Sequence, residues 1–287
     1  MPEPVKTQEV VLHHAPPSFY SQVARLVLAE KGVRYRGRVA VAGPPLFETY
    51  QPWYMQLNPA GTVPTLVVGD EILDDSHVIL REVDARFEGN PLTPSSPDAI
   101  DEMERWIGKA YGLSERVLTY GTGKFRTLGA RVNARRRKAL LRLRDRHPAL
   151  RAQYEAKLAD IDAFIADAGN AATVADVDQR YEASLDELDA RLSDRPYICG
   201  ASYSLADVVW TVLVARQLML GRAALAGRPS LAAWYGRVKE RGSFREADVW
   251  ERFDAWKLLP VMLTKLKRPL LALLLLAVGG ITAFIYL

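Results

Sequence analysis

Residues 58–80, NPAGTVPTLVVGDEILDDSHVIL, contain the stretch that decides the fold. Two runs in it are strand-like, TLVV at 65–68 and EILD at 71–74. Gly69 and Asp70 stand between them, and a Gly-Asp pair between two apolar runs is a strong hairpin signal. This stretch therefore predicts two antiparallel strands joined by a tight turn.

The elements on either side of the hairpin complete a mixed α/β unit. EVVLHHA (9–15) is strand-like, residues 21–31 have apolar positions at helical spacing, and VRYRGRVAV (33–41) alternates like a strand. After the hairpin, Asp75 and Ser76 stand where a helix should begin, because short polar side chains cap the first turn. The predicted order is strand, helix, strand, loop, hairpin and helix.

A second local motif lies far downstream, in GASYSLADVVW (200–210). Ser204 can cap a helix there while Asp207, three residues later, returns a hydrogen bond to the cap residue. Asp replaces the usual Glu or Gln of such a capping box. We expect both residues to have a structural role.

These motifs, in this order, resemble those of the glutathione transferases. The resemblance covers roughly residues 8–118 and 178–245, and its matching stretches are PSFYSQVARLVLAEKG (17–32), NPAGTVPTLVVGDEIL (58–73), DDSHVIL (74–80) and GASYSLADVVW (200–210). It implies an α/β N-terminal thioredoxin-like domain and an all-α C-terminal glutathione-transferase domain.

The resemblance also implies a glutathione site in the N-terminal domain. Val63-Pro64 matches the family's cis-proline position, where the backbone of Val63 would meet the cysteinyl part of glutathione. Asp75 and Ser76 match the acidic-Ser pair that receives the γ-glutamyl end. A carboxylate can accept hydrogen bonds from an ammonium, and a helix N-terminus favours a carboxylate.

Ser18 falls at the catalytic position of the family's serine and cysteine types. A hydroxyl there can donate to a thiolate, and the positive end of the helix lowers the pKa of the thiol further. Ser18 can equally be the helix cap, and the two roles are compatible. The family's tyrosine types need Tyr near the end of the first strand, where this chain has His13 and His14. Tyr20 is a secondary hydroxyl candidate.

A long insert separates the two halves of the resemblance, at residues 119–177. From 124 to 151 it carries eleven Lys or Arg and one acid, Asp145, and 153–169 has an amphipathic helical pattern. The insert is either a solvated helical excursion or a basic face for anionic lipid headgroups. Nucleic acid is not an expected partner, because the net charge is only +4 and no aromatic side chains interrupt the basic run.

The chain ends in nineteen consecutive uncharged residues, 269–287. A helix of that length spans about 28 Å, close to the roughly 30 Å of a bilayer core. Lys265, Lys267 and Arg268 precede the run, so the positive-inside rule predicts a single-pass C-terminal transmembrane helix with the bulk of the chain on the cytoplasmic side.

Insert and tail together are similar in layout to the tail-anchored ganglioside-induced differentiation-associated protein group, as are SFYSQ (18–22) and PWYMQLN (52–58). The expected domains are a thioredoxin-like glutathione-binding domain (8–90), an all-helical domain (98–245) containing the insert 119–177, a linker or juxtamembrane helix (246–268) and the transmembrane anchor (269–287).

Composition limits the chemistry. One cysteine, Cys199, excludes an internal disulfide framework, and four scattered histidines offer no metal-ligand spacing. The sequence predicts a membrane-anchored transferase that conjugates glutathione, its co-substrate, to a hydrophobic electrophile, with the bilayer and a second copy of the chain as further partners. The alternative is a non-catalytic glutathione- or lipid-sensing membrane adaptor that acts through the basic insert.

Overall fold

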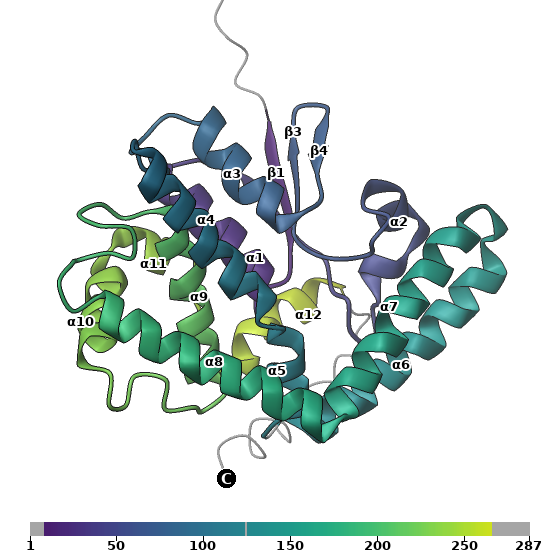
Figure 1. Cartoon of the computed structure of the whole chain (residues 1–287). Helices are drawn as coiled ribbons and strands as arrows, with labels where there is room; N and C mark the ends of the chain where they lie inside the picture. Colours follow the sequence, from purple (N-terminus) through teal and green to yellow (C-terminus); the bar gives the residue numbers. More distant parts are fainter. Residues whose placement is uncertain (1–8, 124, 266–287) are drawn as a thin grey trace, which may run out of the picture.

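A four-stranded sheet forms the first part of the molecule (Figure 1). The structure is a computed structural model, and it describes residues 9–123 and 125–265. The elements of this part are β1 (Val10–His14), α1 (Phe19–Glu30), β2 (Arg36–Val39), η1 (Glu48–Tyr50), α2 (Pro52–Leu57), β3 (Thr65–Val68), β4 (Glu71–Leu73) and α3 (Ser76–Arg86).

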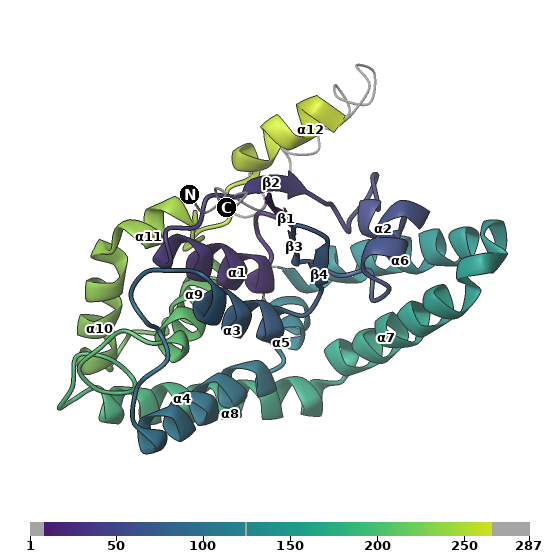
Figure 2. The same ribbon diagram turned by 90° about the horizontal axis from the view of Figure 1, so that it is seen from above.

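The strand order is β2-β1-β3-β4, with β1 parallel to β2 and β3 antiparallel to both of its neighbours. Leu12 pairs with Leu66 across the two central strands, and neither side chain is exposed. Helices α1 and α3 pack side by side against the sheet, as Figure 2 shows. This arrangement is the predicted thioredoxin-like α/β domain.

Local sequence signals account for the ends of these elements. The hairpin turn between β3 and β4 contains Gly69 at φ +60°, a conformation that a side chain would strain. Helix α1 stops at Gly32, where φ is +63° and the next amide, that of Val33, returns to the carbonyl oxygen of Leu28 at 2.9 Å. The strand-helix-strand-hairpin-helix order predicted from the sequence is confirmed.

A helical part follows, and its centre is one buried helix. Almost every residue of α9 is buried, as expected for a helix that is apolar on all sides. The elements of this part are α4 (Pro97–Gly112), α5 (Glu115–Gly121), α6 (Phe125–Arg146), η2 (Pro148–Leu150), α7 (Arg151–Gly169), α8 (Ala171–Arg191), α9 (Leu205–Met219), α10 (Pro229–Glu240), α11 (Gly242–Glu246), η3 (Ala255–Leu258) and α12 (Leu259–Lys265).

The residues between the two halves of the family resemblance form a helical hairpin, α6 and α7, that projects beside α2 (Figure 1). A separate apolar cluster joins this hairpin to the sheet-containing part and includes Tyr50, Met55, Leu140 and Tyr154. The Tyr154 hydroxyl donates to the carbonyl oxygen of Tyr50 at 2.9 Å. The insert is thus packed against the first domain as well as against the second.

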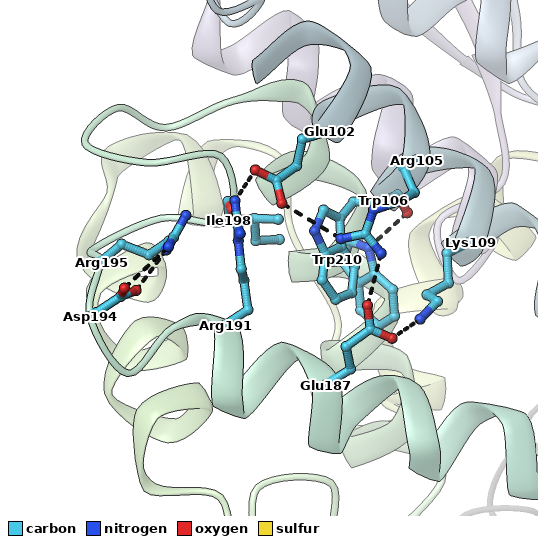
Figure 3. A network of polar contacts seen from close by, with 10 residues as sticks. All are labelled: Glu102, Arg105, Trp106, Lys109, Glu187, Arg191, Asp194, Arg195, Ile198 and Trp210. Atoms are coloured by element: carbon cyan, nitrogen blue, oxygen red, sulfur yellow. Dashed lines mark hydrogen bonds and ion pairs between the residues drawn. The ribbon is translucent and has the colours of Figure 1, made fainter. Parts of the chain in front are cut away.

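Helices α4 and α8 are joined by ion pairs, drawn in Figure 3. Glu187 of α8 accepts from Arg105 at 2.8 Å and from Lys109, and Arg191 pairs with Glu102. Behind them the indole Nε1 of Trp210 donates to the carbonyl oxygen of Trp106 at 3.0 Å. Self-association of the chain, which the sequence predicts without a geometry, stays a prediction.

The predicted membrane location requires a correction. Within 9–123 and 125–265, no helix is both long enough and apolar enough to cross a bilayer. Helices α6 and α8 have 22 and 21 residues, but charged side chains are distributed along both. The proposed span at 269–287 lies outside the described residues. We therefore propose neither the bilayer nor its headgroups as partners.

Candidate functional site

A cavity of about 680 Å³ lies where the two domains and the insert meet. Its walls come from the turn before α1, the loop after β2, the loop before β3, and helices α5, α6, α7 and α9. Phe253, Leu258 and Val261 also line it. Segments from the whole length of the described chain therefore contribute to one site.

Ser18 lies in the wall of this cavity, at the N-cap of α1. Its Oγ accepts from the amide of Ser21 at 3.3 Å, so the cap predicted from the sequence is present. That bond uses an oxygen lone pair and leaves the hydroxyl proton for another acceptor. A negatively charged atom next to Ser18 Oγ would accept a hydrogen bond from this hydroxyl and would also face the positive end of α1.

Tyr20, two residues after Ser18, lines the same cavity. Its ring packs edge-on against Phe19 and contacts Tyr111, with centroids 5.0 and 5.8 Å apart. Burial raises the pKa of the Tyr20 hydroxyl to about 12, and Glu115 adds to the effect. The phenol therefore stays protonated at neutral pH and can act only as a hydrogen-bond donor or neutral acceptor.

The loop before β3 places Val63 in the cavity wall, and the Val63-Pro64 peptide bond is cis. Pro64 itself is buried behind the wall. The preceding carbonyl oxygen, that of Thr62, accepts from the Tyr54 hydroxyl at 2.6 Å and from Asn58 Nδ2 at 3.2 Å. Tyr54 and Asn58 thus fix the peptide that precedes Val63.

Asp75 and Ser76 stand at the N-terminus of α3 and do not line the cavity. Asp75 Oδ1 accepts from the amides of His77 at 2.7 Å and Val78 at 3.2 Å, so this carboxylate caps its own helix. The fully buried Asn58 connects this helix start to the loop before β3, since its Nδ2 also donates to the carbonyl oxygen of Asp74 at 3.4 Å. The two regions are one connected unit.

Ser204 and Asp207 lie in the core of the helical domain and are absent from the cavity wall. Asp207 Oδ2 accepts from the Ser204 amide at 2.9 Å and from its hydroxyl at 2.7 Å. Its Oδ1 accepts from Ile198 N at 3.1 Å and from Trp234 Nε1 at 2.8 Å. The pair joins the start of α9 to α10 and to the preceding loop.

A buried ion pair that the sequence did not reveal lies beside the turn that carries Ser18. Arg216 Nε is 3.0 Å from Glu115 Oε1, and the two side chains are 6% and 8% exposed. Another nitrogen of Arg216 donates to the carbonyl oxygen of Pro17, and Thr119 Oγ1 donates to Glu115 at 2.6 Å. One signal existed in the sequence, since Arg216 is the one basic residue of the mostly apolar helix α9.

A second charged part of the cavity wall, here called the insert wall, is formed by Arg116, Arg136, Lys157 and Asp160 of α5, α6 and α7. Asp160 is 3.0 Å from both Arg116 and Lys157. Although burial works to raise it, hydrogen bonds from Arg116 and the charge of Lys157 lower the pKa of Asp160 to about 2. Burial lowers the pKa of Lys157. Arg136 completes this wall and donates to the carbonyl oxygen of Ala42 at 3.2 Å.

Two family models match the chain, Glutathione S-transferase, N-terminal domain, over residues 12–91 and Glutathione S-transferase, C-terminal domain, over residues 171–237. Tetrachloro-p-hydroquinone reductive dehalogenase of Sphingobium chlorophenolicum is 37% identical over 242 residues, which are 84% of this chain and 96% of the relative. Human ganglioside-induced differentiation-associated protein 1-like 1 is 26% identical over 83% of this chain and 73% of its own length.

Solved structures share the fold at lower identity. The β-etherase LigF from Sphingobium sp. strain SYK-6 superposes with a TM-score of 0.62 at 21% identity, over 83% of this chain and 98% of its own. At that identity the likeness concerns the fold alone. It agrees with a thioredoxin-like first domain and a helical second one.

Proposed function

This chain belongs to the glutathione S-transferase family, with a layout like that of the ganglioside-induced differentiation-associated proteins, and we propose that it is a serine-type glutathione transferase. The family uses glutathione and takes hydrophobic second substrates. The observation that carries the proposal is the position of the Ser18 hydroxyl, in the cavity wall and at the positive end of α1.

Ser18 has the central role in this mechanism. A thiol reacts as its thiolate, and a hydroxyl donor together with a helix N-terminus lowers the thiol's pKa. The thiolate sulfur attacks an electrophilic carbon, the C–S bond forms, and the leaving group departs with the electron pair of its broken bond. The proton of the thiol goes to solvent before the attack.

The remaining predicted residues would position glutathione. Val63 would pair through its backbone with the cysteinyl part, and its loop is already fixed by Tyr54 and Asn58. Asp75 would accept from the γ-glutamyl ammonium with the oxygen that does not cap α3, and Ser76 would bind the carboxylate. The support for this arrangement is that Asn58 connects both regions.

The second substrate would occupy the rest of the cavity, whose walls include Tyr120, Phe125, Leu128, Ile161 and Phe164. Side chains of this kind favour an apolar or aromatic molecule. The printed name of the relative from Sphingobium chlorophenolicum makes a chlorinated hydroquinone a reasonable acceptor to try beside the common substrate chlorodinitrobenzene.

The test compares Ser18→Ala with Ser96→Ala in the full-length chain. Ser96 caps α4 through a bond to Ala99 N at 3.3 Å, so each variant loses one helix cap, with an expected loss of about 1 kcal/mol of stability. Only Ser18→Ala should lower kcat/KM with glutathione, by about 100-fold, because a hydrogen bond to developing negative charge is lost. The ultraviolet absorbance of bound thiolate should fall in parallel.

Two outcomes would count against this mechanism. Full activity of Ser18→Ala would rule out the serine role. If activity and thiolate absorbance were instead lost in Tyr20→Phe, the hydroxyl of Tyr20 would be the thiolate's donor. Calorimetric titration of glutathione into Asp75→Ala, where binding should weaken, tests the γ-glutamyl position separately.

A further inference from the structure

More cations than acids line the cavity. Among the described residues the cations are Arg116, Arg136, Lys157 and Arg216, and the acids are Glu115 and Asp160. A cavity with apolar walls screens charge weakly, so an excess of positive charge there is felt strongly by a ligand.

Both acids are already engaged. Glu115 is paired with Arg216 and also accepts from Thr119. Asp160 is shared between Arg116 and Lys157, at 3.0 Å from each. No carboxylate that lines the cavity is left for the fourth cation.

The fourth cation is Arg136 of α6. In the part of the chain that the structure describes it has no carboxylate within ion-pair distance. Its hydrogen bonds go to neutral oxygens, from Nε to Ala42 O at 3.2 Å and from Nη1 to Asn133 Oδ1 at 3.0 Å. These two bonds orient the half-buried guanidinium without neutralising it.

The neighbourhood of Arg136 is itself short of negative charge. Lys157 is 7% exposed, and burial lowers its pKa; Asp160 opposes this shift, while the charges of Arg116 and Arg136 add to it. Bringing a cation into such a site is unfavourable unless an anion joins it. A ligand anion would relieve that repulsion.

We propose that the insert wall of the cavity binds a carboxylate of the ligand, with Arg136 as its charge partner, while the apolar walls hold the rest of the molecule. A guanidinium matches a carboxylate because its donors lie in one plane. This proposal deepens the proposed function and rests on it. The carboxylate has two sources, the glycine end of glutathione or an acidic second substrate.

The experiment measures equilibrium binding to the full-length chain by calorimetry, so it does not depend on turnover. One arm compares glutathione with its glycine ethyl ester, and the other compares phenylbutyrate with its methyl ester. The variants are Arg136→Gln and Arg136→Lys. Arg137→Gln is the matched control, because it is the next residue, loses the same charge and is paired with Asp162 outside the cavity.

We expect Arg136→Gln to weaken binding of the acid by about tenfold and to leave its ester unchanged, since a charge-assisted hydrogen bond is lost. Arg136→Lys should keep part of the preference for the acid, and Arg137→Gln should behave as the wild type. An effect in the glutathione arm assigns the site to the glycine carboxylate, and one in the phenylbutyrate arm assigns it to the second substrate.

The proposal is overturned if Arg136→Gln retains the wild-type preference for acid over ester in both arms, or if Arg137→Gln loses that preference equally. Failure of the transferase function is a different result. In that case the wild type would show no turnover in any assay, while its preference for phenylbutyrate over the methyl ester would still depend on Arg136.

Discussion

Two parts of the cavity wall, the turn before α1 and the insert wall, are held in different ways. The turn before α1 is fixed by two arginines that are almost fully buried. Arg216 donates to Pro17 O, and Arg25 donates to Pro16 O at 3.2 Å. The insert wall is held by the apolar cluster that joins it to Tyr50 and Met55 and by exposed ion pairs, such as Arg137 with Asp162, whose side chains are 47% and 45% exposed.

This difference indicates which part of the cavity wall should move when a ligand binds. Hydrogen bonds from buried charged groups are directional and costly to break, whereas exposed ion pairs contribute little. Elements held by the weaker set open more readily. We expect the wall with Ser18 to be the fixed one and the insert to adjust to the second substrate.

The largest expected effect comes from breaking the fixed wall with Arg216→Met. The free energy of unfolding should fall by about 3–5 kcal/mol, because Glu115 is left as an unpaired buried charge. Thermal and urea unfolding measure the loss. Arg216→Met combined with Glu115→Leu should recover most of it, since the unpaired charge is gone. A single variant as stable as the wild type would mean that this pair does not secure the wall.

A smaller effect is expected from Tyr154→Phe in the insert wall. The change removes one buried hydrogen bond, from the hydroxyl to Tyr50 O at 2.9 Å, and should lower stability by about 1 kcal/mol. Hydrogen exchange should become faster in α6 and α7 and stay unchanged in α1. Equal acceleration in α1 would contradict the idea that the two walls are held independently.

The smallest effect concerns pH and Asp160. Its pKa is lowered to about 2, so the folded state binds fewer protons at this group than the unfolded chain, whose aspartates titrate at about 4. The stability it contributes is full above about pH 4 and is lost as pH falls toward 2. For a partly exposed pair it should be below about 1 kcal/mol.

The measurement is the Tm of the wild type and of Asp160→Asn across pH. The difference should be constant at neutral pH and should shrink below about pH 4. Asp162→Asn, in a more exposed pair on the same helix, is the control for the loss of an ion pair from α7. A difference that grows as pH falls would have the wrong sign for a carboxyl with a lowered pKa.

Much of the fixed wall follows from short stretches of sequence. Ser18 stands directly before α1, and the loop with Val63 directly precedes β3, so order along the chain is enough to place both. The buried Glu115–Arg216 pair could not be predicted from the sequence, because the Arg216–Pro17 contact joins residues 199 positions apart. A local sequence pattern indicates which side chains can cap a helix or form a turn. It does not indicate which charged residue from a distant part of the chain will contact them.

The sequence by itself determined the strand and helix order, the hairpin and the helix caps, since these depend on neighbouring residues. It also indicated a basic insert, but not which of its basic residues line the cavity. Arg135, Arg136 and Arg137 are consecutive, yet only Arg136 lines the cavity and the other two are exposed. A helix turns by about 100° per residue, so the docking of α6 against the rest of the protein alone decides which arginine faces inward.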